Sequence, residues 1–179
     1  MTTELLLQRK NPRSITIDEI AGRASASKGT IYKQWGSKSA LFVESFFDSV
    51  RNELIFDETL PALEALRKQY HSLVSMLAGA HGEVLRALIG ESQFDTEIHS
   101  ALLKGYFLPR RSAAIGCVAD AIDAKELRND LSPDIAVDAL YGALFYALMV
   151  RYRTLDDRWA NDVIDAVLQG LKRSPGRSR

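Results

Sequence analysis

The sequence predicts an all-α protein. Apolar residues recur at three- and four-residue spacing along the chain, and no alternating apolar–polar run with a hairpin turn occurs. The five prolines are widely spaced, and all but Pro109 fall outside strongly periodic runs, where a helix can begin or break. With 179 residues, 46% of them hydrophobic, the chain is long enough for one ordinary domain with a proper core.

Capping residues set the expected helix boundaries in the first third of the chain. Thr16 is expected to cap a helix, with Glu19 three residues later forming a capping box. Ser27 and Ser37 are expected to cap the next two helices, and Gly36 ends the first of these. Together with apolar periodicity, these signals predict helices over residues 2–10, 16–24, 27–35, 37–55, 60–79, 83–93, 95–107, 110–124, 133–153 and 157–172.

The net charge is zero, but the charges are unevenly distributed. Residues 1–43 carry seven basic and three acidic side chains, residues 44–171 carry twelve and twenty, and residues 172–179 carry four basic ones. A basic head on an acidic body favours an anionic partner for the head, with chance and solubility as the alternative. The zero balance argues against a uniformly basic, histone-like binder.

The last two predicted helices are unusually apolar. The 133–153 helix carries apolar or small residues on nearly all faces, so nearly all faces must be covered. Two such helices in succession indicate a four-helix interface across a two-fold axis, with a monomeric core as the alternative. The interface residues expected on this pattern are Tyr141, Phe145, Leu148, Tyr152, Val163 and Val167. The uncharged run from Ala139 to Val150 is too short to span a membrane, for which roughly 20 residues are needed.

Residues 16–35 have the layout of a helix-turn-helix, whose second helix enters the DNA major groove. Ile31 and Trp35 are expected to anchor the second helix in the core. The outer side of that helix then presents hydroxyls, ammonium groups, a phenol and a glycine, a surface that can approach DNA closely: Ser27, Lys28, Gly29, Thr30, Tyr32 and Lys33.

This segment resembles the TetR family of bacterial transcriptional regulators. The family signature, T-x-x-x-I-A-x-x-A-G-V-S-K-G-x-[IL]-Y-x-x-[FW]-x-x-K-x-x-L, is matched from Thr16 to Leu41, and the run SKGTIY followed by WGSK is specific. The resemblance implies a DNA-binding domain over residues 1–45 and a helical ligand-binding and dimerisation domain over 46–179, which ends in a basic tail. The single cysteine favours a reducing cytoplasm, and a homodimer with two recognition helices predicts a palindromic double-stranded DNA operator.

The resemblance assigns roles to individual residues. Thr16, Tyr32 and Lys38 contact phosphates, which fixes the register on DNA without reading sequence. Lys28, Thr30 and Lys33 are the candidates for base edges, with solvated surface charge as the alternative for the lysines. If each subunit makes four phosphate contacts, a dimer neutralises about eight charges and the expected salt slope is near −7.

The chain departs from the family pattern at three places. Ser25 stands where glycine is usual at the turn, and a positive φ there costs on the order of 1 kcal/mol. Ala26 stands where a larger apolar residue is usual. The first helix is about one to two turns shorter than in the family, so the expectation is a less stable head with weaker DNA binding.

The body of the chain is expected to bind a small molecule whose identity the sequence does not specify. Its aromatic and apolar residues suit either a pocket or a core, and the pocket candidates are Phe46, Tyr70, Met76, Phe94, Tyr106 and Phe107. The three histidines are isolated, and Cys117 is expected to be a buried structural thiol, so we expect no metal site and no cofactor. No catalytic constellation is present, so an enzyme is not expected.

Two functions fit these observations. The first is a ligand-responsive transcriptional regulator, most simply a repressor that a small molecule releases from its operator. The alternative is a helical small-molecule-binding or interaction protein that has lost DNA binding, as Ser25 and the short first helix would allow.

Overall fold

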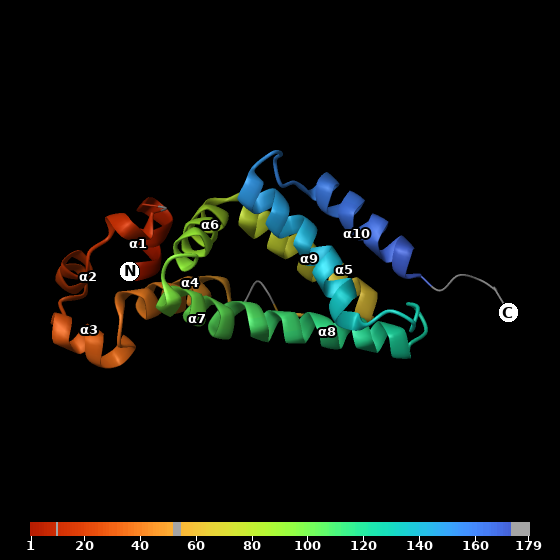
Figure 1. Cartoon of the computed structure of the whole chain (residues 1–179), viewed down its shortest axis with the longest axis horizontal. Coiled ribbons are helices and arrows are strands. Elements are labelled where there is room, and N and C mark those ends of the chain that lie inside the picture. Colours follow the sequence, from red (N-terminus) through yellow and green to blue (C-terminus); the bar gives the residue numbers. More distant parts are fainter. Residues whose placement is uncertain (10, 52–54, 173–179) are drawn as a thin grey trace, which may run out of the picture. The chain divides into compact units, whose positions relative to one another are not determined.

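The computed structural model describes residues 1–9, 11–51 and 55–172, which form helices without a strand (Figure 1). The all-α prediction is confirmed. The elements, in chain order, are α1 Thr2–Arg9, η1 Pro12–Ser14, α2 Ile17–Ala24, α3 Lys28–Trp35, α4 Lys38–Val50, α5 Ala62–Ala78, α6 Ala80–Ser92, α7 Thr96–Leu102, η3 Leu103–Phe107, α8 Leu108–Asp123, α9 Pro133–Val150 and α10 Asp157–Leu171.

The chain divides into two compact units, and neither is continuous in sequence. The first unit comprises Met1–Asn52 and Gly79–Pro109, and the second comprises Glu53–Ala78 and Arg110–Arg179. In the first unit, α4 packs against α1, α6 and α7, and in the second, α10 packs against α5 and α9 (Figure 1). Helices α6 and α7 therefore share a compact unit with the N-terminal helices.

Side-chain caps start the helices of the N-terminal head as predicted. The hydroxyls of Thr16, Ser27 and Ser37 accept backbone N–H groups three residues later, at 3.1, 3.0 and 3.1 Å. Glu19 does not act as expected for a capping box, because its carboxylate pairs with the guanidinium groups of Arg9 at 3.0 Å and Arg23 at 3.5 Å. The prediction that Thr16 caps α2 is confirmed. The Glu19 carboxylate links α2 to α1 through Arg9.

The turn between α2 and α3 is strained at its first residue. Ser25 has φ 50° and ψ 36°, the left-handed conformation that favours glycine. The same residue closes α2, because its backbone N–H donates to the carbonyl of Ala21. The left-handed conformation that glycine usually serves at this position is thus imposed on a serine.

Replacing Ser25 with glycine is expected to raise the free energy of unfolding by about 1 kcal/mol, because glycine adopts this conformation without a Cβ clash. Urea unfolding at a fixed protein concentration measures the change. Ser25→Ala is the matched control, because alanine removes the hydroxyl and keeps the strain. Equal stabilities of the two variants would show that the backbone conformation costs nothing here.

Several helix boundaries differ from the sequence prediction: the helix expected over 83–93 spans Ala80–Ser92, and the helix expected over 133–153 ends at Val150. The helix expected to reach residue 55 is described only to Val50, and residues 52–54 lie outside the described part of the chain. The helices expected over 95–107 and 110–124 are joined without a break by the π-helical segment η3, in which the N–H of Leu108 donates to the carbonyl of Leu103. Pro109 has no N–H to continue the α-helical pattern, so the wider turn precedes it.

The π-helical segment also brings its backbone against α4. A Cβ on Gly105 would lie 2.7 Å from the Phe47 ring, so a larger residue here would require that ring to move. The neighbouring Tyr106 is buried, and its ring stacks on Phe47 with the centroids 5.1 Å apart. This contact packs α4 against η3 within the first unit.

Taken singly, α9 is the one described helix long and apolar enough to cross a membrane, with a mean hydropathy of 1.4 over 18 residues. Length and composition are weak grounds, because core helices pass the same test. One face of α9 packs within the second unit through Val137, Leu140 and Leu144, and the other face leaves Ile135, Tyr146 and Val150 at least half exposed. An apolar helix of this kind needs a second covering surface.

Candidate nucleic-acid interface

Helix α3 is anchored on one side and open on the other. Ile31 is buried at 3% exposure, and Trp35 is half-buried at the end of the helix. The residues predicted to face DNA are all exposed, and the Tyr32 side chain is 46% accessible. They are Ser27, Lys28, Gly29, Thr30, Tyr32 and Lys33. The structure therefore brings the six expected residues of this segment together on an accessible surface.

Lys28 is tethered to the preceding helix. Its Nζ lies 2.6 Å from a carboxylate oxygen of Asp18, and both side chains are more than half exposed. The hydrogen bond with Asp18 raises the pKa of the Lys28 ammonium, so the group stays charged. An exposed pair of this kind contributes little to stability, so Lys28 can exchange Asp18 for an anion or a base edge at small cost.

Hydroxyl groups on the same surface retain hydrogen-bonding capacity. The Oγ atom of Ser27 lies 2.9 Å from Oγ1 of Thr30, and both residues are exposed. Thr16 accepts the N–H of Glu19, which leaves its own proton free to donate. Such groups suit contacts to phosphate oxygens, and the first N–H groups of α2 and α4 add anion-binding donors.

Lys38 begins α4, and its Nζ lies 5.1 Å from the centroid of the Phe42 ring. Among the described residues, Lys33 and Lys38 are the head lysines without a carboxylate partner within 4 Å. The Phe42 face holds the Lys38 ammonium without neutralising it. Neither ammonium group is therefore held in a direct ion pair among the described residues.

Ion pairs also hold arginines of the first unit. Besides the pairs of Glu19, Arg13 lies 3.3 Å from the carboxylate of Glu91 in α6. The four-residue spacing of Glu19 and Arg23 is a visible helical signal. No signal links Arg13 to Glu91, because only the packing of η1 against α6 brings them together.

Comparison with known proteins decides the family. The model of bacterial regulatory proteins of the TetR family matches residues 2–44, and a tetracycline-repressor-like C-terminal domain model matches residues 57–167. The chain belongs to the TetR family.

A helix-turn-helix-type transcriptional regulator of Bacillus subtilis strain 168, YdeS, is 30% identical over 167 residues, which cover 93% of this chain and 84% of YdeS. The crystal structure of the TetR-family regulator SCO0332 superposes with a TM-score of 0.83 at 28% identity, covering 96% of this chain and 94% of that one. The regulator FadR from Bacillus subtilis, solved in complex with stearoyl-CoA, has a TM-score of 0.71 at 20% identity over 95% and 97% of the two chains. This last likeness shows the shared TetR fold.

The residues expected to form a ligand pocket are divided between the two compact units. Phe46, Phe94, Tyr106 and Phe107 belong to the first unit of this TetR-family chain, whereas Tyr70 and Met76 belong to the second. Phe46, Tyr70, Met76 and Tyr106 are buried in the cores of their units. Phe94 is 89% exposed, because it lies in the connection between α6 and α7 and not on a packed helix face.

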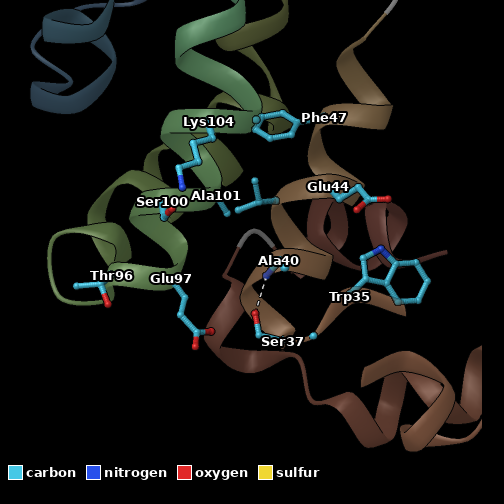
Figure 2. A pocket seen from close by; sticks show the side chains of 13 residues that line it. Trp35, Ser37, Ala40, Glu44, Phe47, Thr96, Glu97, Ser100, Ala101 and Lys104 are labelled. Atoms are coloured by element: carbon cyan, nitrogen blue, oxygen red, sulfur yellow. Dashed lines mark hydrogen bonds between the residues drawn. The ribbon is translucent and has the colours of Figure 1, made fainter. Parts of the chain in front are cut away.

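A groove of about 720 Å³ lies within the first unit, between α4 and the α7–η3 segment (Figure 2). Figure 2 shows Ser37, Ala40 and Phe47 on the α4 side and Glu97 and Ser100 on the α7 side. The indole of Trp35, at the end of the recognition helix, also lines it. None of the six expected pocket residues lines this groove, although its volume suits a small molecule.

The residues expected at the dimer interface divide between core and surface. Leu148 is buried at 3% exposure within its own protomer, because it lies on the α9 face that packs in the second unit. Four of the expected residues are half-buried: Tyr141, Phe145, Val163 and Val167. The hydroxyl of Tyr141 lies 2.5 Å from Oε1 of Gln69. Tyr152 is 55% exposed. The exposed stripe of α9 is a different one, composed of Ile135, Ala139, Gly142, Tyr146, Met149 and Val150.

Cys117 lies on α8, where its thiol donates to the carbonyl of Ala62 at 3.1 Å. Burial raises the pKa of the Cys117 thiol to about 11, so the thiolate is scarce at neutral pH. The expectation of a structural thiol agrees with this environment.

Proposed function

We propose that the chain is a cytoplasmic, homodimeric transcriptional repressor of the TetR family that a small molecule releases from a palindromic operator. The observation that carries the proposal is the exposed row from Ser27 to Lys33, held outward by the buried Ile31. A hydroxyl, an ammonium group, a glycine and a phenol on one short helix match the donors and close approach that the major groove requires. Thr16 and Lys38, at the starts of neighbouring helices, are proposed to hold the flanking phosphates.

Residues 1–45 are proposed to form the DNA-binding domain, and residues 46–179 the domain for ligand binding and dimerisation. The apolar stripe of α9 supports the dimer, because one protomer leaves Tyr146 at 61% exposure and Ile135 at 50%. A second copy related by a two-fold axis would cover the same stripe on both chains. Two recognition helices on one duplex then explain a palindromic operator.

The effector we propose is a small molecule with both apolar and polar parts, in keeping with the mixed lining of the groove in Figure 2 and with the stearoyl-CoA bound by FadR. Its binding would favour a spacing of the two heads that mismatches the operator, which requires a differential affinity of a few kcal/mol between the two states. Stearoyl-CoA, titrated into the preformed protein–DNA complex, is the first probe for release.

Selection from a random duplex library tests the DNA-binding part of this function. The full-length chain is expected to enrich an inverted repeat whose half-sites lie about one helical turn apart or somewhat more. The absence of any enriched sequence at 50 mM salt would favour the alternative, a TetR-fold protein that binds small molecules and no longer binds DNA. Two observations favour this alternative: the left-handed conformation of Ser25 and the ion pair between Lys28 and Asp18.

A further inference from the structure

Glu91 pairs with Arg13 of the DNA-binding head and lines the same groove as Lys38. It lies in the last turn of α6, and its carboxylate is 3.3 Å from Nε of Arg13 in η1. The Glu91 side chain is only 16% exposed, whereas that of Arg13 is 70% exposed. A withdrawn carboxylate therefore holds a guanidinium that otherwise extends into solvent.

Lys38 and Asp95 complete the surroundings of Glu91. A groove of about 360 Å³ in the first unit is lined by these four charged residues. Arg13 and Lys38 attract the carboxylate, whereas Asp95 repels it. The two cations belong to the segments that immediately precede α2 and begin α4, the two helices whose starts are proposed to meet phosphates.

Stability does not explain Glu91. Burial raises the pKa of its carboxyl group, and the attraction of Arg13 and Lys38 only partly offsets this effect. The guanidinium of Arg13 is largely exposed, so solvent screens its pair with Glu91 and the pair contributes little to the stability of the fold.

We propose that Glu91 is a positioning residue for DNA binding, an internal anion that occupies Arg13 and attracts Lys38, so that phosphate must compete with it for both. Arg13 can then contact a phosphate only after its ion pair with Glu91 has broken. This inference rests on the proposed DNA-binding function and adds a residue of α6 to it.

Glu91→Gln tests the inference, because the amide keeps the shape and loses the charge. The variant is expected to bind random-sequence duplex DNA roughly tenfold more tightly at low salt. The slope of log K against log salt should steepen by about 2, since each freed Arg13 in a dimer adds about 0.9. Glu126→Gln is the matched control: Glu126 is exposed in the other unit and makes the same change in net charge. A Glu91→Gln slope equal to that of the control overturns the inference.

Arg13→Gln keeps the test decisive even if Glu91→Gln alters folding. In the wild-type background, Arg13→Gln should leave the salt slope unchanged, because Glu91 already occupies the guanidinium. In the Glu91→Gln background it should remove the added slope. An equal effect of Arg13→Gln in both backgrounds overturns the inference while DNA binding stands. Failure of the wild-type chain to bind any duplex overturns the proposed function instead.

Discussion

Lys28→Ala is expected to weaken operator binding at least 30-fold. A lysine that reads a guanine edge contributes about 1–3 kcal/mol per half-site, and a dimer uses two copies, so the loss is about 2–6 kcal/mol. The Asp18 partner lowers this value only slightly, because the pair is exposed and easily exchanged. Tyr32→Phe should have a loss of similar size, because it removes a hydrogen bond to a charged phosphate in each half-site.

Fluorescence anisotropy with the selected operator measures both variants, and thermal unfolding provides the first control. The unfolding temperature should not change, since both side chains are exposed and neither supports the core. Lys104→Ala is the matched charge control, an exposed lysine in η3 of the same unit. Normal operator binding by both head variants would show that the outer side of α3 is not the reading surface.

Gly142→Glu is expected to convert the dimer into monomers. Gly142 lies on the exposed stripe of α9, and a Cβ there meets nothing within 4 Å in one protomer. The isolated fold should therefore accept the side chain. In the dimer, two carboxylates would be buried against an apolar surface, which costs several kcal/mol per ion. Operator affinity should fall by more than two orders of magnitude, and the salt slope should halve.

Sedimentation equilibrium measures the mass of the variant, and circular dichroism checks its helix content. Gly22→Glu serves as the control, because Gly22 is also an exposed helical glycine with open space around it, in the other unit. That variant should remain dimeric. A dimeric Gly142→Glu protein with normal operator affinity would show that the exposed stripe of α9 is not the subunit interface.

The sequence was sufficient for features set by local interactions. The three caps at Thr16, Ser27 and Ser37 require only a hydroxyl and the N–H three residues later, so the pattern located them correctly. The left-handed conformation of Ser25 was indicated by the resemblance, because the family usually has glycine at this position.

Features that depend on packing between distant segments could not be obtained in this way. Leu148 and Tyr146 are both apolar residues of α9, and periodicity alone does not say which face turns toward α5 and α10. The Arg13–Glu91 pair arises only where η1 meets α6. Phe94 was a pocket candidate because it is aromatic, but it lies in the connection between α6 and α7 and is exposed.

The salt dependence and stoichiometry of operator binding test the central claim most directly. Four phosphate contacts in each of two chains predict two chains per duplex and a slope of log K against log salt near −7. Binding by a single chain with a slope near −3.5, or affinity that does not change between 50 and 200 mM salt, would contradict a symmetric pair of recognition helices on DNA.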